Sequence, residues 1–220
     1  MSESAPAPDP MLTPVPTPAP SSWNVANGLT VLRILLVPVY GWLLLVNGGE
    51  HAPQRYWAAA VFVVAIATDR IDGDIARSRG LVTNFGKIAD PIADKALMGM
   101  ALVGLSTLGE LPWWITAVVL VREWGITTMR FVVIRHGVMP AGRGGKVKTA
   151  LQSIALTLFT LPLWVFAHSG VWRGAAWVVL SLAVGVTVIT GLDIALKALR
   201  LRQTSERTAM KRAARAARPQ

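Results

Sequence analysis

Long apolar runs alternate with short polar, glycine-containing connections between residues 28 and 199. Each run has at least the roughly 20 residues that an α-helix needs to cross a bilayer. This pattern predicts an all-α integral membrane protein with six transmembrane helices. The predicted helices are 28–47, 56–77, 87–108, 112–135, 147–168 and 172–199.

Two tails flank this six-helix membrane domain, which spans residues 23–199. Residues 1–22 are rich in Pro, Ala, Ser and Thr, and they predict a disordered tail because they cannot bury enough apolar surface. Residues 200–220 form a basic tail that we expect in the cytoplasm. This tail either contacts anionic lipid headgroups or is a solvated segment without a role.

The composition supports a membrane protein. The chain is 53% hydrophobic and 15% charged, with a mean hydropathy of +0.47, whereas a water-soluble domain carries about a quarter charged residues. The net charge of +10 has no soluble basic domain to carry it, so we expect membrane lipids as partners and no nucleic acid. The absence of cysteine excludes disulfides and zinc–thiolate sites.

Lysine and arginine are distributed unevenly between the connections. The connections after the second and fourth runs are basic, as is the C-terminal tail, whereas the opposite connections contain only Arg55 and Arg173. Positive residues favour the cytoplasmic side. We therefore expect a multi-pass protein of the cell inner (cytoplasmic) membrane, with both termini in the cytoplasm.

Four aspartates, Asp69, Asp72, Asp90 and Asp94, lie on either side of one cytoplasmic connection. An ionised carboxylate in hydrocarbon costs a few kcal/mol. Residues three or four apart share a helix face, so the two pairs can converge between antiparallel helices. Carboxylates suit hard cations, and we expect Mg²⁺ or Mn²⁺, as one or two ions. The alternative is that the aspartates cap helices or pair with Arg70, Arg77 and Lys87.

The residues around the aspartates suit a phosphate-containing ligand. Gly73 permits close approach to the helix backbone, and Ala76 leaves space one turn further along. Arg77 can make a forked contact to phosphate. Gly86 opens the following helix.

These residues form the pattern Asp-x2-Asp-Gly-x2-Ala-Arg-x8-Gly-x3-Asp-x3-Asp over residues 69–94. It resembles the signature of the CDP-alcohol phosphotransferases at every fixed position. The resemblance implies that family's fold over residues 24–199 and a binuclear metal centre on Asp69, Asp72 and Asp90. It implies that Asp94 is a further ligand or a neighbour, and the general base. It also implies a CDP-lipid site that includes Asp69, Gly73, Ala76, Arg77 and Gly86.

The family's reaction agrees with the residues. A hydroxyl attacks the β-phosphorus of a CDP-linked lipid and CMP leaves, while the metal ions stabilise the developing charge. A carboxylate near the hydroxyl can accept its proton. The residues alone do not rank Asp94 above the other three aspartates for this role. The resemblance also implies a homodimer.

Three further stretches resemble the phosphatidylglycerophosphate synthases of this family. They are Asn27-Gly-Leu-Thr30-Val-Leu-Arg33, then Val121-Arg122-Glu123-Trp124 with Arg130, then Gly145-Lys146-Val147-Lys148-Thr149. The sequence departs from the pattern at Asp74, where an aromatic residue is common, and at Trp124, where a branched aliphatic is common. The resemblance implies CDP-diacylglycerol and sn-glycerol 3-phosphate as substrates.

A doubly charged acceptor needs cationic partners. Arg122 lies inside an apolar run, where an unpaired guanidinium is costly, and Arg130 is about two turns further along the same face. We expect an acceptor-phosphate site composed of Arg33, Arg122, Arg130, Lys146 and Lys148.

Each of these assignments has a structural alternative. Arg122 can instead pair with Glu123 or another acid, and Lys146 and Lys148 can serve only the membrane topology. Arg33 either reaches a phosphate or extends to the membrane surface. Asn27 and Thr30 either contact the CDP-lipid or cap the first helix.

Three other functions stay open. A cardiolipin synthase, or another CDP-alcohol phosphotransferase, would use a different acceptor. A cation transporter would use the carboxylates to bind its cargo, although the motif lies at helix ends and not at the midplane. A lipid-tethered scaffold would depend on the basic tail alone.

Overall fold

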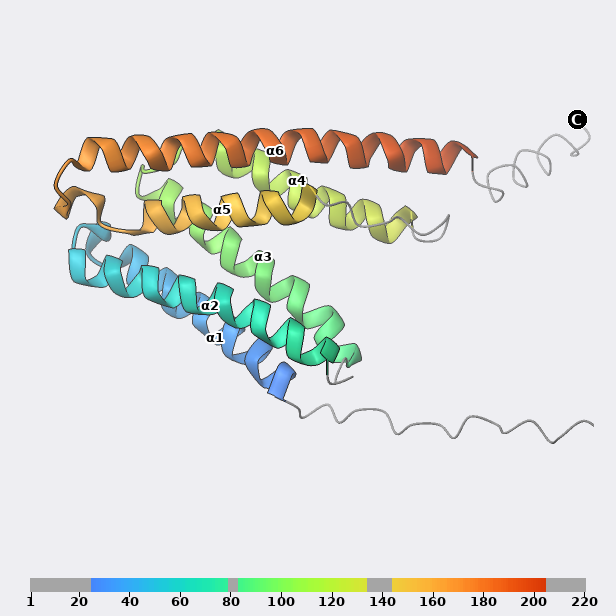
Figure 1. Cartoon of the computed structure of the whole chain (residues 1–220), viewed down its shortest axis with the longest axis horizontal. Coiled ribbons are helices and arrows are strands. Elements are labelled where there is room, and N and C mark those ends of the chain that lie inside the picture. The colour runs from blue at the N-terminus through green and yellow to red at the C-terminus, as the bar shows by residue number, and fades with distance from the viewer. Residues whose placement is uncertain (1–24, 79–82, 134–143, 205–220) are drawn as a thin grey trace, which may run out of the picture.

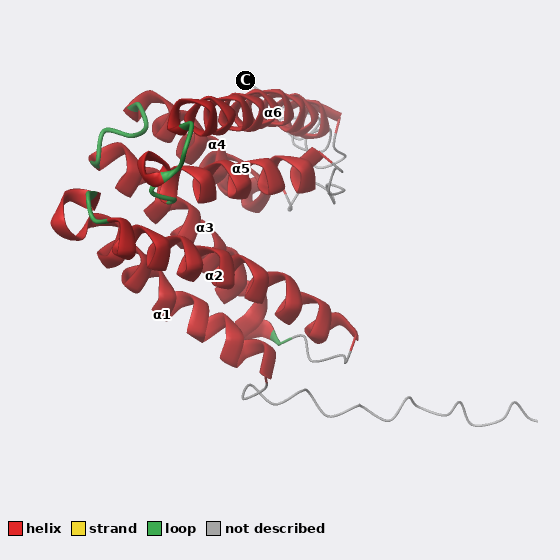
Figure 2. Ribbon diagram, turned by 60° about the vertical axis from the view of Figure 1, so that its left-hand side comes forward, coloured by secondary structure: helices red, strands yellow, loops and turns green. Residues whose placement is uncertain are grey.

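The computed structural model describes residues 25–78, 83–133 and 144–204, and these residues form helices and no strands (Figure 2). The all-α prediction is therefore confirmed for this part of the chain. The predicted tail 1–22 and most of the predicted tail 200–220 lie outside it. The helices are α1 (Val25–Leu45), α2 (Ala52–Ser78), α3 (Asn84–Thr107), α4 (Trp113–Val133), α5 (Gly144–Thr160) and α6 (Ser169–Thr204), with short 3₁₀ turns η1 (Val46–Gly49) and η3 (Leu163–Val165).

The helices form two neighbouring groups. Helix α1 packs against α2 and α3, and α6 packs against α4 and α5. The connections after α1, α3 and α5 gather at one end of the bundle. The start of α1 and the ends of α2, α4 and α6 lie toward the other (Figure 1). We call this second end the site end, because the aspartates of the motif lie there.

Helices α1 and α3 approach closely toward the end of the bundle opposite the site end. A Cβ added at Gly104 would lie 2.6 Å from Leu44 Cδ2, and one added at Gly41 would lie 2.8 Å from Met100 Sδ. Glycine at such contacts lets helix backbones approach closely. These contacts hold the C-terminal half of α1 against the C-terminal half of α3.

The outside of the bundle is apolar. Large side chains such as Trp57, Val121 and Ile189 are about two-thirds exposed or more, at 67%, 72% and 69%. Two described segments, Asn27–Gly49 and Ser169–Leu196, are long and apolar enough to cross a membrane, each with a mean hydropathy of 2.1. The prediction of six spans goes beyond these two and stays a prediction.

The end of α5 differs from the predicted limit at residue 168. The helix ends at Thr160 because Pro162 lacks an N–H and disfavours helical geometry at the residue before it. The side chain of Arg55, from α2, meets this helix end. It donates to Phe159 O at 2.6 Å, Thr160 O at 2.8 Å and Glu110 Oε1 at 2.8 Å. Arg55 is 1% exposed, so it joins α2, α5 and the α3–α4 connection at the end opposite the site.

We predict that Arg55→Met lowers the stability of the fold without changing the site. Breaking a buried ion pair costs about 3–5 kcal/mol, and the substitution also leaves two helix-end carbonyls without their donor. Thermal unfolding in detergent should show a fall in Tm of several degrees. An unchanged Tm would contradict the structural role of Arg55.

Candidate active site

Helix α1 contacts a carboxylate on each of the two helices that follow it. Thr30 Oγ1 donates to Asp90 Oδ1 at 2.5 Å, and Arg33 Nη1 donates to Asp69 Oδ1 at 2.5 Å. Thr30 and Arg33 are three residues apart, which places them on one face of α1. The structure thus brings Asp69 of α2 and Asp90 of α3 to the same face of α1.

The burial of Arg33 corrects one expectation. Its side chain is 1% exposed and pairs with Asp69, whose side chain is 39% exposed. The alternative in which Arg33 extends to the membrane surface is therefore wrong.

Asn27 and Thr83 fix the start of α3. Thr83 is the N-cap of this helix and its Oγ1 accepts from Gly86 N at 3.0 Å. The same hydroxyl donates to Asn27 Oδ1 at 2.9 Å. Asn27 and Thr30 lie inside α1, which begins at Val25, so the alternative in which they cap that helix is wrong.

Gly86 lies where no side chain fits easily. A Cβ added there would be 3.0 Å from Asn27 Oδ1 and 3.7 Å from Asp90 Oδ2. Any larger residue would press on the same groups that hold α1 against α3. The requirement for glycine at this position is therefore steric.

Four further motif residues lie in the last turns of α2. The side chains of Asp72, Ala76 and Arg77 and the surroundings of Gly73 fall outside the part of the chain that the structure describes. In the part that is described, no three His, Cys, Asp or Glu side chains are grouped closely enough to hold a metal ion. The convergence of all four aspartates therefore stays a prediction.

The surroundings of Asp69 and Asp90 nevertheless fit a hard cation. Each carboxylate is oriented by a donor from α1, one a hydroxyl and the other a guanidinium. Carboxylates that bind metals are usually oriented by such hydrogen bonds from neighbouring residues. The atoms that could bind the metal are carboxylate oxygens, and these suit Mg²⁺ and Mn²⁺.

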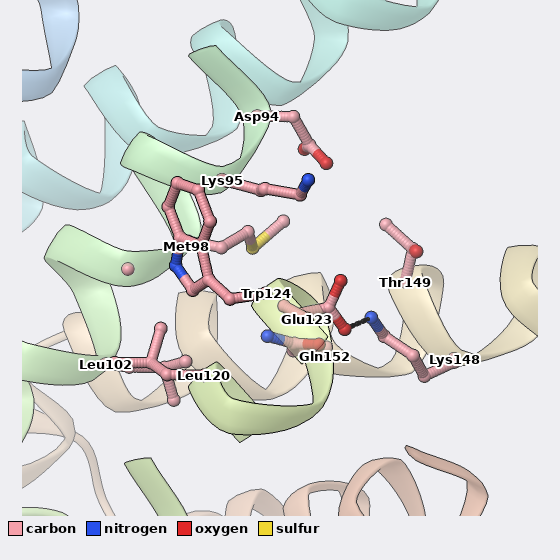
Figure 3. A pocket seen from close by; sticks show the side chains of 11 residues that line it. Asp94, Lys95, Met98, Leu102, Leu120, Glu123, Trp124, Lys148, Thr149 and Gln152 are labelled. Atoms are coloured by element: carbon pink, nitrogen blue, oxygen red, sulfur yellow. Dashed lines mark hydrogen bonds and ion pairs between the residues drawn. The ribbon is translucent and has the colours of Figure 1, made fainter. Parts of the chain in front are cut away.

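Asp94 lies one turn after Asp90 and lines a different space. A cavity of about 30 Å³ lies between α3, α4 and α5, and its polar lining includes Asp94, Glu123 and Lys148 (Figure 3). We call it the α3–α5 cavity. Its volume is enough for one or two water molecules.

Arg122, Glu123 and Lys148 form one network beside this cavity. Glu123 Oε1 accepts from Lys148 Nζ and, at 2.8 Å, from Arg122 Nη1. Arg122 Nη2 also donates to Thr190 Oγ1 of α6 at 3.0 Å. The predicted alternative in which Arg122 pairs with Glu123 is therefore confirmed. Lys148 is 5% exposed and paired with Glu123. It therefore does not serve only the membrane topology. The side chains of Arg130 and Lys146 lie outside the described residues.

The sequence analysis gave no role to three polar residues of this cavity, Lys95, Thr149 and Gln152, and quoted Thr149 only as part of a matching stretch. Lys95 Nζ donates to Thr127 Oγ1 at 2.5 Å and lies 5.4 Å from the ring centre of Trp124. The sequence contained a signal for Lys95 and another for Gln152. Lys95 directly follows Asp94, and Gln152 is four residues after Lys148 on the same helix face.

The chain is similar to named phospholipid synthases along most of its length. A protein of Mycobacterium tuberculosis named "Probable phosphatidylglycerophosphate synthase" is 50% identical, over 83% of this chain and 87% of its own length. The CDP-diacylglycerol–glycerol-3-phosphate 3-phosphatidyltransferase of Bacillus subtilis is 37% identical, over 72% of this chain and 91% of its own. A cardiolipin synthase (CMP-forming) of Streptomyces coelicolor is 29% identical, over 68% of each.

The model of the CDP-alcohol phosphatidyltransferase family matches residues 23–192, a range that includes the whole aspartate motif and the α3–α5 cavity. This match covers far more than half of the chain. The protein therefore belongs to the CDP-alcohol phosphatidyltransferase family.

Proposed function

We propose that this protein is a membrane phosphatidyltransferase of phospholipid biosynthesis. It moves the phosphatidyl group of CDP-diacylglycerol to sn-glycerol 3-phosphate, and the products are phosphatidylglycerophosphate and CMP. The names of the Mycobacterium tuberculosis and Bacillus subtilis relatives support this reaction. The observation that carries the proposal is that α3 presents Asp90 toward Thr30 and Asp94 toward a cavity containing Lys148.

The proposed topology has six membrane spans and an active site that faces the cytoplasm. Both termini lie on that side of the inner membrane. The apolar outside of the bundle and the basic connections at the site end support this arrangement. The homodimer implied by the resemblance is part of the same proposal.

Asp69, Asp72 and Asp90 are proposed to hold two Mg²⁺ or Mn²⁺ ions, with Asp94 as a further ligand or a neighbour. When bound, the ions supply charge stabilisation for the pyrophosphate and for the departing CMP. Thr30 and Arg33 orient two of the carboxylates. Arg33 pairs with Asp69 and stays part of the proposed acceptor-phosphate site.

The CDP group is proposed to lie against the end of α2 and the start of α3, held by Gly73, Ala76, Arg77 and Gly86. Asn27 acts there through Thr83, which caps α3 beside Gly86. Asp94 accepts the proton of the acceptor hydroxyl as that oxygen bonds to the β-phosphorus. The bond from the β-phosphorus to the bridging oxygen then breaks, and CMP leaves.

The acceptor phosphate is proposed to bind Arg122 and Lys148, with Arg33, Arg130 and Lys146. Lys148 lines the α3–α5 cavity with Asp94. This arrangement would place the acceptor phosphate on one side of the general base and the CDP-lipid on the other. A phosphomonoester carries more charge than a phosphodiester and therefore gains more from a cationic site.

We predict that purified protein with Mg²⁺ or Mn²⁺ releases CMP only when CDP-diacylglycerol and sn-glycerol 3-phosphate are both present. The measurement is CMP release across a panel of acceptors: glycerol 3-phosphate, phosphatidylglycerol, serine and inositol phosphate. Equal release with phosphatidylglycerol would favour a cardiolipin synthase, the name of the Streptomyces coelicolor relative. Equal release with serine or inositol phosphate would reject the acceptor assignment.

We predict that Asp94→Asn lowers kcat by at least a hundredfold, because an amide cannot accept the hydroxyl proton and general-base catalysis contributes about 10²–10⁴-fold. Binding of CDP-diacylglycerol should change little. Equilibrium binding of the CDP-lipid, measured beside turnover, separates these effects. Turnover near the wild-type rate would exclude Asp94 as the base.

We predict that Thr30→Val raises the Mn²⁺ concentration needed for half-maximal activity by about 10–100-fold, the usual cost of losing a residue that orients a metal ligand. The substitution keeps the shape and removes only the donor to Asp90. Thr107→Val is the matched control, because that hydroxyl donates to Val103 O of its own helix. If both variants need the same Mn²⁺ concentration, Thr30 does not act through Asp90.

A further inference from the structure

We infer that Glu123 is a positioning residue for the acceptor phosphate, because it holds Lys148 and Arg122 in place beside Asp94. This inference rests on the proposed function and deepens it. Glu123 is an acid between cations, so it would repel the acceptor if it acted alone. Its contacts with Arg122 and Lys148 instead give it the role of holding these two cations in place.

One oxygen of Glu123 serves two cations from different helices. Glu123 Oε1 accepts from Arg122 Nη1 of α4 and from Lys148 Nζ of α5. Arg122 continues the network to Thr190 of α6. The backbone carbonyl of Glu123 also accepts from Thr127 Oγ1 at 2.8 Å, and that hydroxyl in turn accepts from Lys95 of α3. Glu123 is therefore connected to every helix that lines the cavity.

Both cations need this partner to stay where they are. Their side chains are only 6% and 14% exposed, for Lys148 and Arg122. Two buried positive charges that lie side by side repel each other unless an anion lies between them. Without Glu123, Lys148 would also gain freedom among its many rotamers, which binding would have to remove again.

Lys148 keeps donors for a ligand while it contacts Glu123. An ammonium group has three N–H donors, and the hydrogen bond to Glu123 Oε1 uses one of them. Lys148, Arg122 and Glu123 together carry one net positive charge. Glu123 thus fixes the direction of the cations and leaves a positive site. Donors fixed in this way before binding give a better-oriented complex.

The competing partner for a released Lys148 is Asp94, which lines the same cavity. A lysine that moved toward Asp94 would leave the acceptor phosphate and approach the proposed base. Glu123 therefore keeps the phosphate-binding cation apart from the proton-accepting carboxylate. The first effect of its loss should appear in acceptor binding.

The test compares Glu123→Gln with the wild type in the full-length protein. Glutamine keeps the shape and one acceptor oxygen but loses the charge. We expect the KM for glycerol 3-phosphate to rise about 10–100-fold, as for the loss of a hydrogen bond to a charged group. The KM for CDP-diacylglycerol should change less than about threefold. Glu110→Gln is the matched control, since Glu110 pairs with buried Arg55 away from the cavity. It should lower Tm and leave the acceptor KM unchanged.

A double-mutant cycle tests whether Glu123 acts through Lys148. Lys148→Gln alone should raise the acceptor KM, and adding Glu123→Gln should change it by less than about twofold, because coupled residues are not additive. The shift of Tm with added glycerol 3-phosphate gives the same comparison without turnover. If Glu123→Gln does not fold, Glu123→Asp is used, which keeps the charge and shortens the reach.

The outcomes separate the inference from the proposed function. If the wild type releases no CMP with glycerol 3-phosphate, the proposed function fails. If the wild type is active and Glu123→Gln leaves the acceptor KM unchanged, the inference alone is overturned. It is also overturned if both substrates lose affinity equally, or if the effects of Glu123→Gln and Lys148→Gln multiply.

Discussion

The contact of α1 with two carboxylates is the interaction on which the site end depends. Asp69 and Asp90 lie on different helices, and each would be costly in an apolar bundle without a partner. Thr30 and Arg33 provide those partners from one helix face. The same contacts set how α2 and α3 lie against α1, so the fold and the positions of the carboxylates are determined together.

Buried cations occur at both ends of the bundle, but their surroundings differ. Arg55 donates to two helix-end carbonyls and to Glu110, and the ring of Trp164 lies 5.3 Å away. These contacts suit a fixed structural role. Lys148 instead lines a cavity with Asp94 and keeps donors for a ligand. Both cations are paired with a glutamate, so the difference between the structural cation and the proposed binding cation lies in what surrounds each one.

The sequence predicted the helices well and their contacts only in part. Apolar runs indicated all six helices, but the end of α5 was misplaced by eight residues because the effect of Pro162 was overlooked. The aspartate spacing predicted the site. The partner of Arg33 is 36 residues away, and that of Asn27 is 56 residues away. No local pattern fixes such pairs, because they depend on how α1 packs against α2 and α3. The pairing of Arg122 with Glu123 was foreseen because these residues are adjacent, whereas the place of Lys95 in the cavity depended on the packing of α4.

Helix α3 separates two environments that the proposed reaction must join. Asp90 and Asp94 are four residues apart, about one helical turn, so their side chains are close together. Asp90 contacts α1 in the first helix group, whereas Asp94 lines a cavity formed with α4 and α5 of the second group. In the proposed reaction, the first group provides the carboxylates for the CDP-lipid, and the second provides the cations for the acceptor. A transfer between the two substrates then requires both groups to meet at α3, where the proposed base lies between them.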